Sequence, residues 1–266
     1  YNPVIGRFTQ EDTYRGDGLN LYAYCAGNPV YYVDPSGHIC RKTADRVLQQ
    51  LSEDEQGREL LKKYQKQIED ALSYQIETEK KKEQYWQTTY ADKTIAYDGN
   101  NFTMSGYGKA HFNKDAIEEF RTEYTDINGN KKGIMQMLDD VIDGYDRLEK
   151  FGYKKKKAGR DDDTPYSFYA SHAEKMLFTL DKINVIGVSR NMCTDCQDYF
   201  WAKAKADNEP KIIADPSAIH IFMQDGKQIN ILYGLENIRI EEGVVGPRAL
   251  KVTPSFKVKS RKGVSQ

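Results

Sequence analysis

The feature that most constrains the fold is the regular alternation of helical and strand-like segments in the last third of the chain. The successive segments are 171–182 (helix), 184–190 (strand), 193–206 (helix), 211–215 (strand) and 218–224 (strand). Only Pro216-Ser217 separates the last two strands, so they are expected to pair antiparallel. Helices that alternate with strands are typical of a layered α/β domain. We therefore expect an α/β fold, with a mixed sheet of about five strands flanked by helices.

The segments before this part predict further helices and one hairpin. Residues 41–90 carry apolar side chains at helical spacing among many Glu, Lys and Gln, which predicts one or two amphipathic helices. In 93–109, apolar and aromatic residues flank the turn sequence Asp98–Asn101, which favours a β-hairpin. Residues 114–150 again have helical periodicity, with a break at 126–130.

Composition limits the kinds of partner. The chain has 266 residues, 39% hydrophobic and 30% charged, and a formal net charge of −1. A chain without bulk positive charge needs a local basic groove if it binds nucleic acid. No apolar run approaches the roughly 20 residues that span a bilayer, so no membrane span is expected.

The four cysteines fall into two kinds. Cys25 and Cys40 are isolated, whereas Cys193 and Cys196 form a C-x-x-C pair. Such a pair is either a metal clip or a redox pair. A thioredoxin-like redox pair is expected in a βαβ unit near the start of a domain. Cys193 and Cys196 lack this context, so a metal-binding role is favoured over a redox role.

The order His172-Ala173-Glu174, then Cys193 and Cys196, supplies a set of metal ligands. A catalytic zinc takes three protein ligands and leaves a fourth position for water. Cys193 and Cys196 lie where a strand meets a helix, so both sulfurs can point to one spot. His172 and Glu174 would diverge in mid-helix, but at a helix start both can lean towards the metal. We predict that His172, Cys193 and Cys196 bind Zn²⁺.

This pattern resembles the cytidine-deaminase-like fold, and especially its bacterial toxin branches, over about residues 90–235. Met192 stands where that family has Pro, and the gap between Glu174 and Cys193 is short. The resemblance implies hydrolytic deamination, with cytosine to uracil in DNA or RNA as the main expectation. Glu174 would be the catalytic proton shuttle from water to the ring nitrogen and the leaving amine. Substrate-binding residues are not encoded by the motif.

Residues 1–38 resemble the end of an Rhs/YD-repeat core, through Y-N-P-x-I-G-R-F, G-L-N-L-Y-A-Y and N-P-V-x-Y-V-D-P-S-G. In that family a β-rich shell encloses a C-terminal toxin, which is cut free after a conserved motif. The positions that match this autocleavage motif are Pro29, Asp34, Pro35 and Gly37, followed by His38 where the family has Leu. The resemblance implies a secreted or surface-delivered polymorphic toxin that acts in the target-cell cytoplasm. Its expected partners are the Rhs shell before release and a cognate immunity protein.

The expected organisation is thus an Rhs remnant (1–38), a helical lead or linker (39–90), a deaminase domain (91–250) and a basic tail (251–266). Two alternatives stay open. The same metal site would serve an adenine or free-nucleotide deaminase, with single- or double-stranded nucleic acid or a nucleotide as substrate. In a different class of protein, the zinc would be structural and the domain a nuclease or binding module.

Other conspicuous residues have simpler explanations. His220 lies in an apolar strand and is expected to be packed, and His111 has no clear role. The aromatic run Tyr199–Trp201 fits core packing on a helix. The run Lys154–Lys157 fits a solvated loop, although it could also touch phosphate.

Overall fold

The computed structural model describes residues 41–85, 93–106, 124–125, 129–158, 161, 165–180, 183–233 and 238–244. The helices are α1 (Arg41–Glu53), α2 (Glu55–Glu83), α3 (Ile134–Glu149), α4 (Ser167–Ala170), α5 (Ala173–Leu177) and α6 (Thr194–Asp207). The strands are β1 (Ile95–Tyr97), β2 (Phe102–Met104), β3 (Tyr124–Thr125), β4 (Lys131–Lys132), β5 (Val185–Val188), β6 (Lys211–Ala214), β7 (Ala218–Phe222), β8 (Lys227–Leu232) and β9 (Arg239–Val244).

The main sheet has seven strands in the order β2-β1-β5-β6-β7-β8-β9. Strands β5 and β6 are parallel, and the other neighbouring pairs are antiparallel. The α/β class and the mixed sheet are confirmed, as is the antiparallel pairing of β6 with β7. The expected number of about five strands is too low. Strands β8 and β9 were not predicted, although β8 has the alternation of polar and apolar residues that indicates a strand. Half of the residues of β9 are charged.

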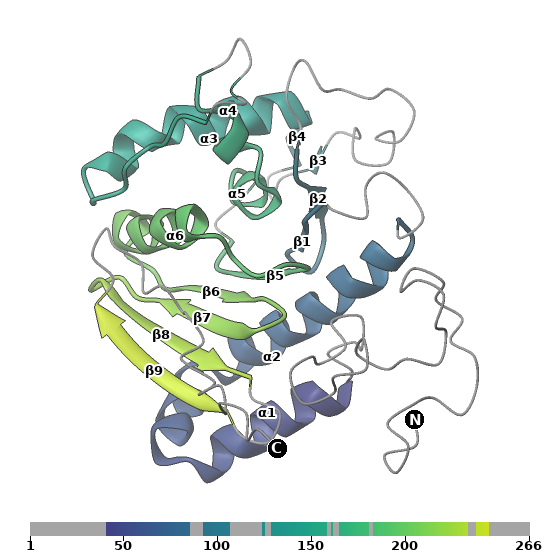
Figure 1. The fold of residues 1–266 in the computed structure, drawn as a ribbon, viewed down its shortest axis with the longest axis vertical. Helices are drawn as coiled ribbons and strands as arrows, with labels where there is room; N and C mark the ends of the chain where they lie inside the picture. The colour runs from purple at the N-terminus through teal and green to yellow at the C-terminus, as the bar shows by residue number, and fades with distance from the viewer. Residues whose placement is uncertain are drawn as a thin grey trace, which may run out of the picture.

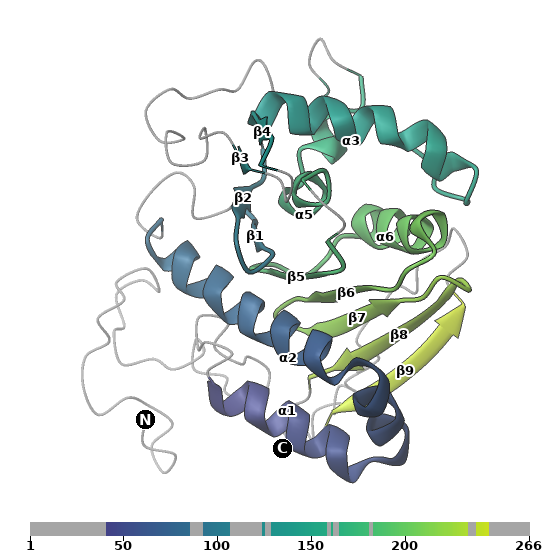
Figure 2. The same cartoon turned by 180° about the vertical axis from the view of Figure 1, so that it is seen from behind.

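Helices cover both faces of this sheet (Figures 1 and 2). Helices α1 and α2 lie on one face, and α5 and α6 lie on the other, with α3 outside them. Successive strand residues point to opposite faces, so each face has its own apolar cluster. Ile212 and Ile219 pack with α1 and α2, whereas Ile213 and Phe222 pack with α3, α5 and α6. The molecule is therefore a three-layered sandwich.

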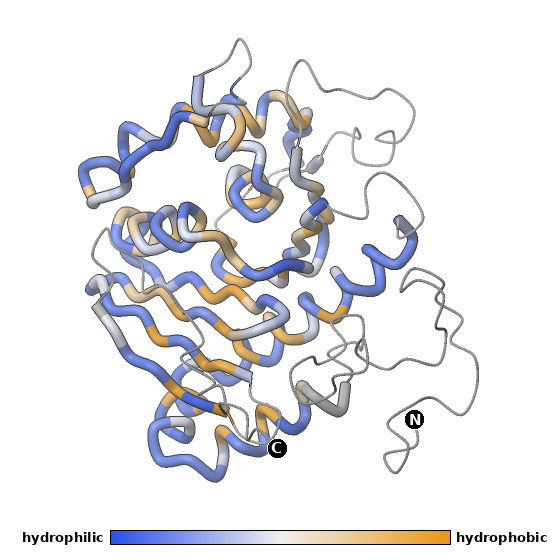
Figure 3. Tube along the Cα trace, in the orientation of Figure 1, coloured by the Kyte–Doolittle hydropathy of each residue, from blue (hydrophilic) through white to orange (hydrophobic). Residues whose placement is uncertain are grey.

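Hydropathy along the chain follows these layers (Figure 3). Hydrophobic residues collect on the strands of the sheet and on the helix faces turned towards it, while the C-terminal end of α2 is hydrophilic. That end carries Lys80, Lys81 and Lys82. None of the described helices, including the 29-residue α2, has a stretch apolar enough to cross a membrane.

Local structure agrees with the sequence signals at several places. The hairpin β1–β2 forms around Asp98, whose carboxylate accepts hydrogen bonds from the backbone N–H groups of Asn100 and Asn101. The expected helix 171–182 is shorter than predicted: α5 ends at Leu177, and three residues in turn conformation follow it. An amphipathic pattern thus located the segment but not its length.

Helix α2 contacts β5 at a residue without a side chain. A Cβ atom at Gly187 would overlap the backbone of Tyr74 and Gln75 in α2. The Gln75 side chain beside this contact is fully buried. Only glycine allows the helix to lie this close to the strand.

We expect Gly187→Ala to destabilise the protein by about 3 kcal/mol, because the new methyl group meets backbone that cannot rotate away. Urea unfolding followed by circular dichroism measures this loss. Gly144→Ala in α3 is the matched control, since a Cβ there meets nothing within 4 Å. Alanine is favoured over glycine inside a helix by up to about 1 kcal/mol, so the control should be slightly stabilised. Equal stability of the two variants would contradict this account of the α2–β5 contact.

Candidate metal centre

Three predicted ligands lie at the starts of two helices. His172 is the N-cap residue of α5, and Cys193 is the N-cap residue of α6, followed by Cys196 in its first turn. Strand β5 ends at Val188 and leads directly into this turn. The strand-to-helix connection and the helix start predicted for His172 are both confirmed.

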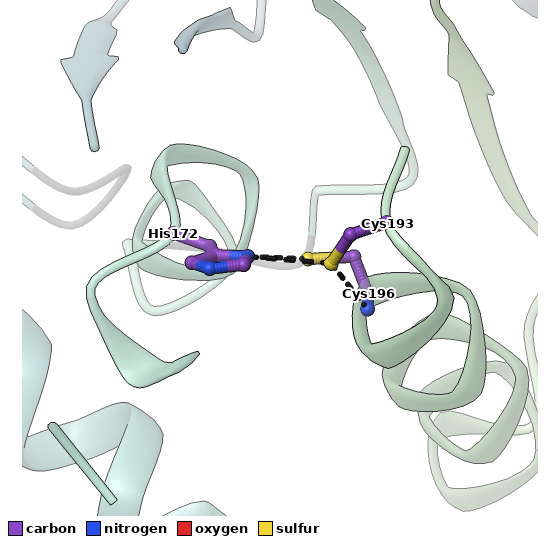
Figure 4. A group of neighbouring side chains, drawn as sticks. All are labelled: His172, Cys193 and Cys196. Atoms are coloured by element: carbon purple, nitrogen blue, oxygen red, sulfur yellow. Dashed lines mark hydrogen bonds between the residues drawn. The ribbon is translucent and has the colours of Figure 1, made fainter. Parts of the chain in front are cut away.

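The three side chains point towards one another (Figure 4). The Nδ1 atom of His172 lies 3.1 Å from the sulfur of Cys196 and 3.5 Å from that of Cys193. The ligand atoms of all three residues lie within 4.8 Å of one another. One imidazole nitrogen and two sulfurs thus converge on a single point, as a shared metal ion requires.

The two thiols are electrostatically unequal. A hydrogen bond with Cys196, together with one from His172 and the backbone N–H of Cys196, lowers the pKa of Cys193 to about 4, against the effect of burial. The N-terminus of α6 also favours a thiolate there. Burial raises the pKa of Cys196 well above its usual value, and the hydrogen bond with Cys193 raises it further. Without a cation, the centre therefore holds one thiolate and one thiol.

His172 completes this arrangement. Burial lowers the pKa of its imidazole, but the hydrogen bond with Cys193 and the charge of Glu174 raise it by more, so the net shift is upward. The ring therefore tends to hold a proton against the Cys193 thiolate. A bound cation would take the place of that proton and of the proton on Cys196.

The donor set fits zinc. Thiolate and imidazole are the ligands that structural and catalytic zinc sites use. Three protein ligands leave one coordination position open, which is the pattern of a catalytic site. In the part of the chain that the structure describes, no fourth Cys or His joins the group.

Glu174 lies beside the centre without belonging to the ligand group. Its side chain is buried, with 4% exposed, and its Oε2 atom has no hydrogen-bond partner among the described residues. Its charge raises the pKa of both His172 and Cys196, so the carboxylate is close to both. A buried carboxylate oxygen without a partner carries a free-energy cost, and a ligand or water in the centre would relieve it.

A buried ion pair joins the two helices that carry the ligands. Lys175 of α5 and Asp195 of α6 are fully or almost fully buried and form a direct ion pair. The Lys175 ammonium also lies 5.0–5.4 Å from the ring centroids of three tyrosines, Tyr145, Tyr153 and Tyr199. Because Asp195 lies between the two cysteines, this pair fixes α5 against α6 at the depth of the metal ligands.

A second buried pair holds the segment before Cys193. The Asp215 carboxylate accepts a hydrogen bond from the backbone N–H of Met192 (2.9 Å) and lies 2.9 Å from Nε2 of His220. The other ring nitrogen of His220 lies 2.8 Å from Oδ1 of Asn230. His220 is buried, as expected from its apolar strand, but it also contacts a carboxylate that holds the backbone next to Cys193.

The Asp215–His220 pair predicts a pH-dependent stability. Burial lowers the pKa of His220, but Asp215 and the hydrogen bond with Asn230 together raise it by more. Burial raises the pKa of Asp215, but His220 and several hydrogen bonds lower it by more. The histidine contribution is complete below its unfolded pKa of about 6.5 and is lost as pH rises through the raised folded value. The aspartate contribution is present above about pH 4 and is lost as pH falls through the lowered value.

We therefore expect His220→Gln to cost about 1–3 kcal/mol near pH 6 and less near pH 9, because the charged pair is lost as pH rises through the raised pKa of His220. Urea unfolding of both proteins at the two pH values measures the difference. A loss that is the same at both pH values would contradict a charged pair.

Sequence reasoning missed several residues that shape the centre: Lys175, Asp195 and Asp215. A charged residue on a helix normally faces solvent, so nothing in the sequence marked Lys175 and Asp195 as a buried pair. Their only signal was position, since each adjoins a ligand-bearing motif. The aromatic residues Tyr199 and Phe200 are buried in the core, as predicted.

Other predicted sites lie outside the described residues. These are His111, the basic tail 251–266 and the cleavage motif Pro29, Asp34, Pro35, Gly37 and His38. Their assignments remain predictions.

No protein-family model matches the chain, and no curated protein matches it. The class of this protein is therefore assigned from its fold and its candidate site alone. It is an α/β protein with a seven-stranded mixed sheet and a His/Cys/Cys group that could hold a metal ion.

Proposed function

We propose that this protein is a zinc-dependent hydrolytic deaminase of nucleobases, with cytosine as the preferred base. The observation that carries the proposal is Glu174, a buried carboxylate with an unpartnered oxygen beside an open three-ligand group. A structural zinc site has no need of such a carboxylate. A hydrolase that moves protons requires one.

The order of elements supports the same proposal. A hairpin (β1–β2) comes first, and β3, β4, α3 and α4 separate it from the helix after His172 (α5). A strand (β5), the helix after Cys193 (α6) and two strands (β6, β7) then follow α5 directly. This is the order that the resemblance to the cytidine-deaminase-like fold implies. The short gap between Glu174 and Cys193 is spanned by the rest of α5, one turn and β5.

Each residue of the site would have a separate role in the reaction. Cys193, Cys196 and His172 would hold the zinc, which supplies an activated water at neutral pH. The Glu174 carboxylate would accept one proton from the attacking water and pass it to the ring nitrogen of the base. It would then take the second proton from the hydroxyl group now bonded to the base and give it to the amine, which leaves as ammonia. Burial of Glu174 excludes bulk water from this path.

The proposed biological setting follows from the N-terminal resemblance. We place the enzyme at the end of an Rhs-type polymorphic toxin, released after His38 and delivered to the cytoplasm of a target cell. Because its product would damage the producing cell, an immunity protein is the expected partner. Expression in a bacterium should therefore raise the rate of base changes and slow growth.

The direct test incubates the zinc-loaded full chain with single-stranded DNA, duplex DNA, RNA and free nucleotides, followed by sequencing or chromatography. C-to-T changes that disappear after zinc removal by a chelator would support the proposal. A-to-G changes would keep the mechanism but change the base to adenine. Strand breaks without base changes, or unaltered substrates with the metal bound, would overturn it in favour of a nuclease or a structural zinc.

A further inference from the structure

The Lys154–Lys157 run lies next to the metal centre. The Lys156 ammonium is 3.6 Å from the Asp195 carboxylate and 3.5 Å from that of Asp198, both in the first turns of α6. Asp195 lies between the two cysteines, so this contact fixes the loop beside the ligands. The interpretation of this run as an ordinary solvated loop does not account for its place.

Two of these lysines remain available to a partner. Lys155 pairs with Asp146 at 2.7 Å, and Lys156 pairs with the α6 carboxylates. Lys154 and Lys157 are exposed, and neither forms an ion pair with a described residue. The pairs made by Lys155 and Lys156 thus hold the loop in place while its two outer charges face solvent.

Three aromatic residues lie along the chain between these lysines and His172. The ammonium groups of Lys155 and Lys157 lie 5.3 and 5.6 Å from the ring centroid of Tyr166. The rings of Phe168 and Tyr169 then lie 5.9 and 5.7 Å from the His172 ring. All three aromatic residues are half-buried, so none of them is sealed in the core.

We propose that Lys154, Lys157, Tyr166, Phe168 and Tyr169, here called the basic-aromatic strip, bind single-stranded nucleic acid. This inference rests on the proposed function and makes its substrate a polymer rather than a free nucleotide. The lysines contact backbone phosphates, and the rings stack on bases next to the one that enters the centre.

The composition of the strip selects this partner over others. Single-stranded nucleic acids are held by cationic side chains along the backbone and by aromatic rings that stack on the bases. A duplex hides its base faces, so the rings would have nothing to stack on. An acidic protein surface would use the lysines but would gain little from aromatic rings beside a buried metal ligand set. Because the net charge is −1, the chain as a whole does not attract a polyanion. A local strip of lysines is therefore needed.

The first test measures binding of the full chain to a fluorescein-labelled single-stranded DNA, by anisotropy over a series of salt concentrations. RNA of the same sequence, the duplex and free nucleotides serve as competitors. In Lys154→Gln/Lys157→Gln, two phosphate contacts are lost, so affinity should fall about tenfold at low salt. The slope of log K against log salt should become less steep by about 1.4, or 0.7 for each phosphate on a single strand.

The matched control is Lys62→Gln/Lys66→Gln, which removes the same charge from α2 on the opposite face of the sheet. These two lysines are 72% and 85% exposed. The control should bind as the wild type does. If both double variants lose the same affinity, the effect is one of total charge, and the strip is not the binding site.

The second test removes stacking without removing charge. Tyr169→Leu keeps an apolar side chain but loses the ring, so binding of single strands should weaken about tenfold. Zinc content measured on the same sample separates lost stacking from a disturbed centre. Unchanged binding in Tyr169→Leu with wild-type zinc content would overturn the stacking role of the strip.

These results separate the inference from the proposed function. Deamination of free nucleotides without polymer binding would overturn the inference and leave the deaminase standing. Polymer binding that depends on the strip, in a chain without zinc or deamination, would support the inference and overturn the proposed function. If the lysines bound only an acidic protein and no nucleic acid, the inference would also be overturned.

Discussion

Glu174→Gln will leave the chain loaded with zinc and will lower the rate of deamination by about 10²- to 10⁴-fold, the usual contribution of a positioned acid–base group. The amide has the size of the carboxylate but cannot accept and return a proton. His172, Cys193 and Cys196 are untouched, so the metal should stay. Parallel measurement of zinc content and of product formation on single-stranded DNA checks both halves of the result.

Glu79→Gln is a suitable control for this change. Glu79 lies on α2, is partly buried, and burial raises its pKa to about 7. It is therefore a second partly desolvated carboxylate, remote from the centre, and its amide variant should keep full activity. An active Glu174→Gln enzyme, or one that has lost its zinc, would show that Glu174 does not carry the proton.

Cys196→Ser should have the second large effect and abolish high-affinity zinc binding. Cys196 is fully buried, and its sulfur lies 3.1 Å from Nδ1 of His172, so no other described side chain can take its place. Changes in the residues that only orient a ligand cost 10- to 100-fold in metal affinity. Loss of a ligand itself should cost more than about 100-fold. Competition with a chromogenic chelator measures the affinity.

Thermal unfolding gives an independent readout of the same change. A ligand that binds only the folded state stabilises it by about 4.1 kcal/mol at a concentration 1,000 times its Kd. Zinc should therefore raise the Tm of the wild type and of a Thr194→Ser control, but not that of Cys196→Ser. Equal zinc-dependent shifts in all three proteins would place the metal elsewhere.

The sequence was sufficient to place His172, Cys193 and Cys196 at the starts of two helices. Helix starts leave backbone N–H groups unpaired and are marked by local signals, which a short window of sequence contains. His172 and Cys193 were both located in this way. The antiparallel pair around Pro216-Ser217 was predictable for the same reason, since a tight turn leaves the chain little choice.

The remaining features depend on contacts between distant parts of the chain. Strand β9 pairs with the edge that β8 forms, and this edge exists only in the folded sheet. The charged sequence of β9 gives no local signal for a strand. The Lys175–Asp195 pair forms across 20 residues, and three tyrosines surround its ammonium group. The place of the Lys154–Lys157 run beside α6 follows from that packing and not from its own composition.

The contact between α2 and Gly187 also bears on how small a working fragment can be made. Among the described residues, the apolar cluster on one face of the sheet is completed by α1 and α2, which precede residue 85. A fragment that begins at the β1 hairpin would keep every ligand of the metal centre but would expose Ile212, Ile219 and Ile221 to water. Such a surface favours aggregation over folding. A shortened chain that keeps the candidate metal centre should therefore retain α1 and α2.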